Sequence, residues 1–164
     1  TSKSLNKKNE ELCGDKVEVV RTGDDVIVVL SDGLGSGVKA NILATLTSKI
    51  IATMMASGMP VEECVRTVTR TLPICKVRKV AYSTFTIIRL INNEVAEIIC
   101  YDNPPVILIR NGVPTDLPGR DMIVGEDKKV HKSELHLQEG DILVAVSDGC
   151  PHAGIGWHIT LAGS

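Results

Sequence analysis

The sequence predicts an α+β fold, because runs of β-branched residues come both before and after two consecutive helical segments. Apolar residues recur at helical spacing over 38–57 and again over 61–72. Two helices in a row, followed by closely spaced strands, do not make the strand-helix-strand alternation of a parallel sheet. We therefore expect antiparallel strands around a helical pair.

A β-hairpin is expected at the start of this fold. Strand candidates cover 16–21 and the wholly apolar 26–30, and the turn-forming residues 22–25 join them. A hairpin brings the start of its first strand close to the end of its second. Asp15 and Asp32 stand at those two ends, so we expect their carboxylates to lie near each other.

The two helices follow a glycine-rich turn. The first is expected over 38–57, and Gly58 ends it. The second starts near Pro60 and has Glu62 and Glu63 in its first turn, where carboxylates interact favourably with the helix dipole. Pro73 ends this helix, because proline cannot continue the backbone hydrogen bonds.

The rest of the chain is typical of short antiparallel strands. β-Branched runs separated by turns predict a meander over 82–91, 95–101 and 106–110. A looser stretch containing Gly and Pro, residues 114–128, then leads to strands near 130–137 and over 142–146.

Composition limits the class of protein. A chain of 164 residues, 43% apolar and 23% charged, is typical of one globular domain, and a net charge of -2 gives no general attraction to nucleic acid or membranes. Five scattered cysteines without a C-x-x-C pair favour neither a disulfide framework nor a zinc site. We expect a cytoplasmic protein with no nucleic-acid or membrane partner, and the missing initial Met is consistent with a piece of a longer chain.

Two Ser-Asp-Gly turns, Ser31-Asp32-Gly33 and Ser147-Asp148-Gly149, each end an apolar strand. A carboxylate at the end of a buried strand needs a cation or hydrogen-bond donors, because burying an unpaired carboxylate costs free energy. With Asp15, the two acids indicate a shared cation, and oxygen ligands suit Mg²⁺ or Mn²⁺ better than zinc. The alternative is that each Asp-Gly simply makes a good turn.

The glycine-rich turn 33–37 offers a rival interpretation, a phosphate-cradling or dinucleotide loop. Its Gly-x-Gly-x-Gly spacing differs from G-x-G-x-x-G, and no Walker lysine accompanies it. The glycines fit better with close approach of the backbone to a metal, so that the Gly33 carbonyl can coordinate it. His131 and His136 are expected on opposite faces of a strand, which prevents simple chelation by the pair, and His152 follows Asp148 in a loop.

Taken in order, the motifs resemble the SpoIIE-type branch of the PP2C (PPM) protein serine/threonine phosphatases. The resemblance covers roughly 14–156 and is carried by Asp15, 29–37 with Ala40, Ser83-Thr84-Phe85, Asn103-Pro104-Pro105, Arg110-Asn111-Gly112 and Val146-Ser147-Asp148-Gly149.

That resemblance implies an αββα sandwich, two antiparallel sheets flanked by helices, formed by residues 1–164 as a single domain that is truncated or discontinuous after about Gly156. It also implies two Mn²⁺ or Mg²⁺ ions and hydrolysis of phosphoserine or phosphothreonine by a metal-activated water. Asp15, Asp32 and Asp148 correspond to catalytic metal ligands, and Gly33 to a ligand through its carbonyl. The helical pair corresponds to the regulatory helices of the family.

The resemblance further suggests a phosphorylated STAS-type anti-anti-sigma regulator as the substrate in bacterial signalling. The family's last strand carries an Asp-Asp-x-Thr-like motif, which this sequence does not contain before its end at Ser164. A catalytically incomplete binding module is therefore the second hypothesis, and a nucleotide-binding domain is the third. Asp102 stands where many relatives have glycine, and we expect no functional role for it.

Overall fold

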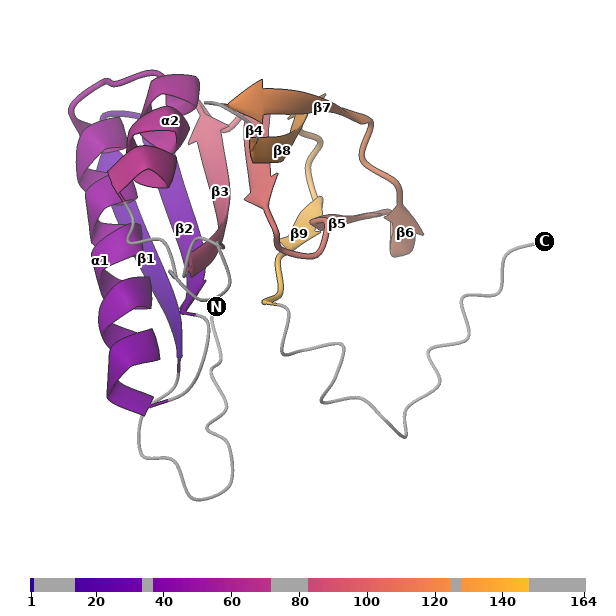
Figure 1. The fold of residues 1–164 in the computed structure, drawn as a ribbon. Coiled ribbons are helices and arrows are strands. Elements are labelled where there is room, and N and C mark those ends of the chain that lie inside the picture. Colours follow the sequence, from indigo (N-terminus) through magenta and orange to yellow (C-terminus); the bar gives the residue numbers. More distant parts are fainter. Residues whose placement is uncertain (2–13, 34–36, 72–82, 125–127, 148–164) are drawn as a thin grey trace, which may run out of the picture.

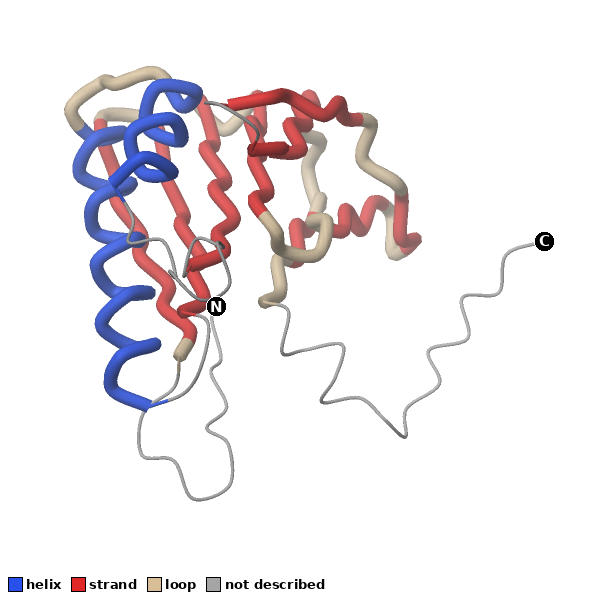
Figure 2. Tube along the Cα trace, in the orientation of Figure 1, coloured by secondary structure: helices blue, strands red, loops and turns tan. Residues whose placement is uncertain are grey.

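The structure is a computed structural model that describes residues 1, 14–33, 37–71, 83–124 and 128–147. This part of the chain contains two helices and nine strands. Figure 1 shows the helices against one face of a large sheet and a small sheet beyond it, and Figure 2 shows the same layers by type. The described residues thus form three layers of the αββα sandwich.

Both sheets are antiparallel throughout. The larger has the order β1-β2-β3-β4-β8-β7 and the smaller the order β6-β5-β9. The strands are β1 Asp15–Thr22, β2 Asp25–Gly33, β3 Ser83–Ile91, β4 Val95–Tyr101, β5 Ile107–Arg110, β6 Val113–Thr115, β7 Gly119–Val124, β8 Lys128–His136 and β9 Ile142–Val144. The expected antiparallel arrangement is confirmed.

The helices α1, Gly37–Ala56, and α2, Val61–Thr71, agree closely with the expected segments. Helix α1 buries Ala40 and Ala44 near its start, and these small side chains let its backbone approach β2 closely. Helix α2 buries Val61, Val65 and Val68, which recur at helical spacing along one face. No described helix is long and apolar enough to cross a membrane.

The large sheet separates two hydrophobic cores. On its helical side, Phe85 and Ile87 of β3 pack with residues of both helices. On the other side, Ile88 packs with Ile98 and with residues of the small sheet such as Leu143. Because side chains alternate along a strand, the even-numbered residues of β3, including Thr84, face the small sheet.

The predicted meander is wrong after β4. Strand β4 pairs with β8, while β5 lies in the small sheet. The chain leaves the large sheet after Tyr101, where Asp102 has a φ of 50° and Pro104 and Pro105 have no amide hydrogen to donate to a ladder. A left-handed φ favours glycine, which is the residue that the family resemblance leads us to expect at this position.

The stretch 114–128 is also more regular than expected, since it contains most of β6 and all of β7. Strand β7 is an edge strand that pairs only with β8 among the described strands. Five of its six residues are exposed or half-buried, so its sequence lacks a strong apolar alternation. Pro118 and Gly119 are also residues that favour a loop, which is why the sequence alone did not predict this strand.

A bidentate ion pair holds the connection into β9. Arg110 donates from Nε and Nη2 to the two carboxylate oxygens of Asp141, at 2.9 and 2.6 Å, and the Gln138 amide also donates to Asp141. These contacts, that with Arg110 above all, lower the pKa of Asp141 from 3.8 to about 2. A lowered pKa in the folded state stabilises the fold above the unfolded pKa, and this contribution is lost as the pH falls.

We therefore expect Asp141→Asn to lower the melting temperature at neutral pH. The difference from the wild type should shrink as the pH falls from 3.8 towards 2, where the native carboxylate also becomes protonated. Thermal unfolding followed by circular dichroism across this range is the measurement. Glu139→Gln, which changes an exposed acid in the same turn, is the control, and a difference that does not vary with pH would contradict the prediction.

Candidate metal centre

Asp15 and Asp32 face each other across the first two strands. Asp15 is the direct partner of Asp32 in the β1–β2 register, and directly opposed residues of an antiparallel pair project to the same face. Both residues are half-buried. The hairpin thus brings together the two acids that the sequence placed at its ends.

The acid pair lies on the face of the sheet that is turned away from the helices. In β2, Val29, Ser31 and Gly33 are buried on the helical side, and Asp32 alternates with them. The carboxylates therefore face the same side as the small sheet. Ser83 of β3 supports this strand end, because its hydroxyl donates to the Asp32 carbonyl at 3.0 Å.

The serine of the second Ser-Asp-Gly sequence reaches the same place. Ser147, which follows β9, donates from Oγ to Asp15 Oδ2 at 2.9 Å and is buried. This contact was not predicted, although the repeated Ser-Asp-Gly sequence was the available signal. Asp148, Gly149 and His152 lie outside the described residues.

Ser31, the equivalent serine of the first turn, has a different contact. Its buried hydroxyl donates to the Ala44 carbonyl of α1 at 2.6 Å. The hydroxyl accordingly fixes α1 to the strand that carries Asp32. The two Ser-Asp-Gly turns look alike in sequence, but one serine connects to a helix and the other to an acid.

Gly33 is required by the close approach of α1. A Cβ added to Gly33 would lie 2.0 Å from the Ala40 carbonyl oxygen. A Cβ added to Gly14 would lie 3.5 Å from both Asp32 Oδ1 and the Gly33 carbonyl oxygen, so these two oxygens flank one small space. The Gly33 amide in turn donates to the Gly14 carbonyl at 3.2 Å, which extends the strand pairing to the end of the site.

This donor set fits a hard divalent cation. Two carboxylates and a backbone carbonyl are oxygen ligands of the kind that Mg²⁺ and Mn²⁺ prefer. Among the described residues, no group of three or more His, Cys, Asp or Glu side chains could hold a metal. The described part of the chain therefore supplies Asp15, Asp32 and the Gly33 carbonyl to such a site.

The remaining candidates lie apart from the acid pair. His131 of β8 contacts Asp121 of β7 at 2.9 Å, near the other edge of the large sheet from β1 and β2, and lowers the pKa of that exposed acid. His136 is exposed. None of the described histidines comes from the strands that carry the acids.

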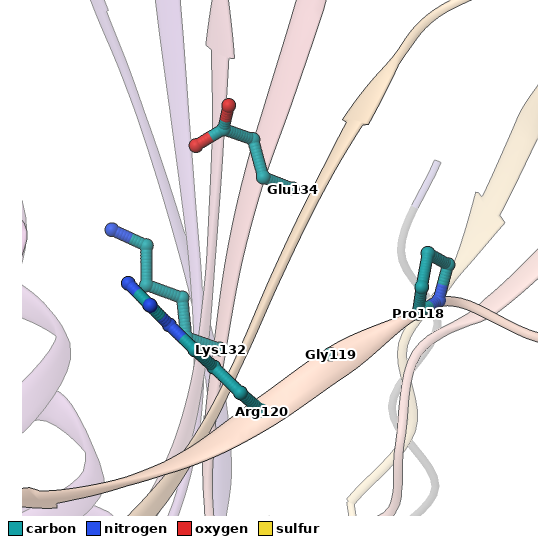
Figure 3. Close-up of a pocket in the computed structure, with 5 residues that line it drawn as sticks. All are labelled: Pro118, Gly119, Arg120, Lys132 and Glu134. Carbon is teal, nitrogen blue, oxygen red and sulfur yellow. The ribbon is translucent and has the colours of Figure 1, made fainter.

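A pocket on the β7–β8 side of the large sheet is also separate from the acids. Figure 3 shows Arg120 and Lys132 extending in the same direction along it, with Glu134 nearby. The Lys132 amine is held by Glu62 of α2 and Glu97 of β4, at 2.5 and 2.6 Å. This lysine therefore connects α2 to the sheet.

Comparison with protein families matches residues 22–158 to Stage II sporulation protein E (SpoIIE). The chain belongs to the SpoIIE family. A search of curated proteins found no match.

Solved structures agree with the SpoIIE-family fold. The phosphatase domain of SpoIIE from Bacillus subtilis, with a fragment of its regulatory domain, has a TM-score of 0.76 at 19% identity, over 89% of this chain and 43% of that one. The structure of RsbX in complex with magnesium has a TM-score of 0.69 at 21% identity, over 90% of this chain and 72% of that one. The RsbU and RsbW domains of a Mycobacterium tuberculosis protein have a TM-score of 0.66 at 18% identity, over 84% of this chain and 40% of that one.

These likenesses establish the PP2C-like phosphatase fold. The chain spans less than half the length of the Bacillus subtilis and Mycobacterium tuberculosis structures. The fold also removes the basis for a Rossmann unit in the described part of the chain. The strand that follows the two helices, β3, pairs antiparallel to β2, whereas a dinucleotide unit needs a parallel return.

We expect Gly33→Ala to destabilise the protein by roughly 1–3 kcal/mol, because a methyl group there would overlap the α1 backbone. Gly14→Ala is the matched control, since its Cβ makes only ordinary contacts; it should change stability by no more than about 0.5 kcal/mol. Urea unfolding measures both. Equal stability of the two variants would mean that α1 does not pack on Gly33 as described.

Proposed function

We propose that this SpoIIE-family chain hydrolyses phosphoserine and phosphothreonine on a protein, with Mn²⁺ or Mg²⁺ held by Asp15, Asp32, the Gly33 carbonyl and Asp148. The observation that carries the proposal is that Asp32 of the first Ser-Asp-Gly sequence and Ser147 of the second both meet Asp15. Asp32 of the first lies opposite Asp15 in the sheet, and Ser147 of the second donates to Asp15. Asp148 follows Ser147 directly in the chain.

Electrostatics supports a cation at this position. Two half-buried carboxylates on neighbouring strands repel each other, and like charges placed directly opposite destabilise a sheet. A divalent cation shared by both acids offsets this repulsion. Ser147 donates a hydrogen bond to Oδ2 of Asp15 and so helps to orient this carboxylate.

The chemistry follows from those ligands. When bound, Mn²⁺ or Mg²⁺ would activate a water for attack on phosphorus and neutralise the charge that develops on the phosphate. Asp15 and Asp32 would hold the cations. Ser83 holds the Asp32 carbonyl, and Ser31, the preceding residue, holds this strand end to α1. No covalent intermediate on a protein nucleophile is needed.

The substrate we propose is a phosphorylated STAS-domain anti-anti-sigma regulator in the bacterial cytoplasm. Support comes from the proteins with similar structures, which include RsbU and RsbW domains and a structure described with the bacterial stressosome. The stressosome structure matches with a TM-score of 0.69 at 20% identity.

The second candidate is a non-catalytic binding module. It is favoured by one observation, that the described residues bring together two acids and no larger cluster. Such a module would recognise the phosphorylated protein without turnover. Metal-dependent hydrolysis separates the two candidates directly.

We expect Mn²⁺-dependent hydrolysis of both p-nitrophenyl phosphate and a phosphoserine protein, which EDTA abolishes. Asp32→Asn and Asp148→Asn should each lower kcat/KM by about 100-fold or more, because even residues that only support metal ligands cost roughly 10–100-fold. Asp24→Asn is the control, since Asp24 is an exposed acid in the turn at the far end of the same hairpin.

Two results would contradict the proposal. Full Mn²⁺-dependent activity in both site variants would remove the acids from the mechanism. Absence of activity in the wild type, together with retained binding of the phosphoprotein, would favour the non-catalytic module instead.

A further inference from the structure

Two buried polar atoms have no hydrogen-bond partner among the described residues, Thr84 Oγ1 and Asn103 Oδ1. Thr84 is only 5% exposed. Folded proteins rarely leave buried polar atoms unsatisfied, because each then loses its hydrogen bond to water without replacement. Two such atoms in one region indicate a missing ligand or water.

Thr84 lies beside the proposed metal ligands. It is the direct partner of Asp32 in the β2–β3 register, just as Asp15 is the partner of Asp32 in the β1–β2 register. The three residues therefore form one row across three strands. Their side chains project to the same face of the sheet.

Asn103 reaches the same face from the β4–β5 connection. Its Nδ2 donates to Thr86 Oγ1 at 3.1 Å, and Thr86 is two residues from Thr84 along β3, so the two threonines share a face. Thr86 in turn donates to Cys100 Sγ at 3.9 Å. These contacts orient the carboxamide, with its Oδ1 left without a partner.

The backbone holds Asn103 in this position. Asp102 adopts a left-handed φ of 50°, which turns the chain out of β4. Pro104 then restricts Asn103 to extended conformations. The connection therefore presents one side chain to the sheet in a defined way.

The chemistry of the two atoms limits what the missing partner can be. A carboxamide oxygen accepts a hydrogen bond or binds a cation, so an ionised phosphate cannot be its partner. A hydroxyl both donates and accepts. One water molecule satisfies both: it donates to Asn103 Oδ1, accepts from Thr84, and retains one hydrogen for a third acceptor.

We propose that Thr84 and Asn103 hold a water whose remaining hydrogen is donated to the Asp32 carboxylate, and that both are positioning residues of the metal site. The water fixes the orientation of Asp32 before a cation binds. This inference rests on the proposed function, because it assigns Asp32 to a metal.

Thr84→Val tests the inference, because valine keeps the shape of threonine and removes the hydroxyl. Titration calorimetry with Mn²⁺ alone should give an affinity about tenfold weaker than wild type, the range found when groups that orient metal ligands are lost. Thr84→Ser retains the hydroxyl and should restore affinity to within about threefold. The melting temperature of the metal-free Val variant should not fall, so weaker binding is not a consequence of unfolding.

A double variant tests whether the two residues share one water. Asn103→Ala should weaken Mn²⁺ binding by a similar factor, and Thr84→Val with Asn103→Ala should weaken it no further than either change alone. If the double variant weakens Mn²⁺ binding by the product of the two single factors, the two residues do not share one water. Thr115→Val, at an exposed threonine of β6, is the control for loss of a hydroxyl.

The outcomes separate this inference from the proposed function. Wild-type protein that does not bind Mn²⁺ would overturn the proposed function and this inference with it. Wild-type binding that Thr84→Val leaves unchanged would overturn the inference alone, and a simultaneous rise in melting temperature would identify the hydroxyl as a merely unsatisfied group.

Discussion

The pairing of Asp15 with Asp32 across β1 and β2 is the constraint on which the rest of the site depends. Directly opposed like charges weaken a sheet, yet the surrounding contacts hold these two in place. Ser83 fixes the end of β2 through the Asp32 carbonyl, Ser31 fixes it to α1, and Ser147, in the segment after β9, binds Asp15. Several independent contacts thus keep the two acids together, as expected for the cation site that we propose.

The large sheet connects the two sides of the molecule through β2. Its helical side receives α1, which approaches closely enough to require Gly33 and accepts the Ser31 hydrogen bond at Ala44. Its other side carries Asp32. A displacement of α1 would therefore act on the strand end that presents a proposed metal ligand, which is a physical route for the regulatory role that the family resemblance assigns to the helical pair.

Local pattern was sufficient to predict much of the fold and part of the site. The turn at 22–25 and the apolar run before Asp32 predicted the hairpin, and the hairpin alone brings Asp15 to Asp32. Both helices were predicted because their apolar spacing and their Gly and Pro boundaries are local signals. The antiparallel class followed from the order of elements.

Long-range pairing could not be predicted in the same way. The pairing of β4 with β8 and the transfer of β5 to the small sheet depend on the turn at Asp102, and β7 has too few buried residues to show strand periodicity. The roles of three further residues depend on partners that are distant in the sequence. Ser147 contacts Asp15, which is 132 residues away, and Thr84 lies opposite Asp32, which is 52 residues away. Asn103 contacts Thr86, which is 17 residues away. Such contacts are visible only once the sheets are assembled.

The most direct test of the account is anomalous diffraction from crystals of the protein grown with Mn²⁺. The account predicts a manganese peak in contact with the carboxylates of both Asp15 and Asp32, on the face of the sheet turned away from α1. A peak bound elsewhere, or none at saturating Mn²⁺ while the two acids remain paired, would contradict it.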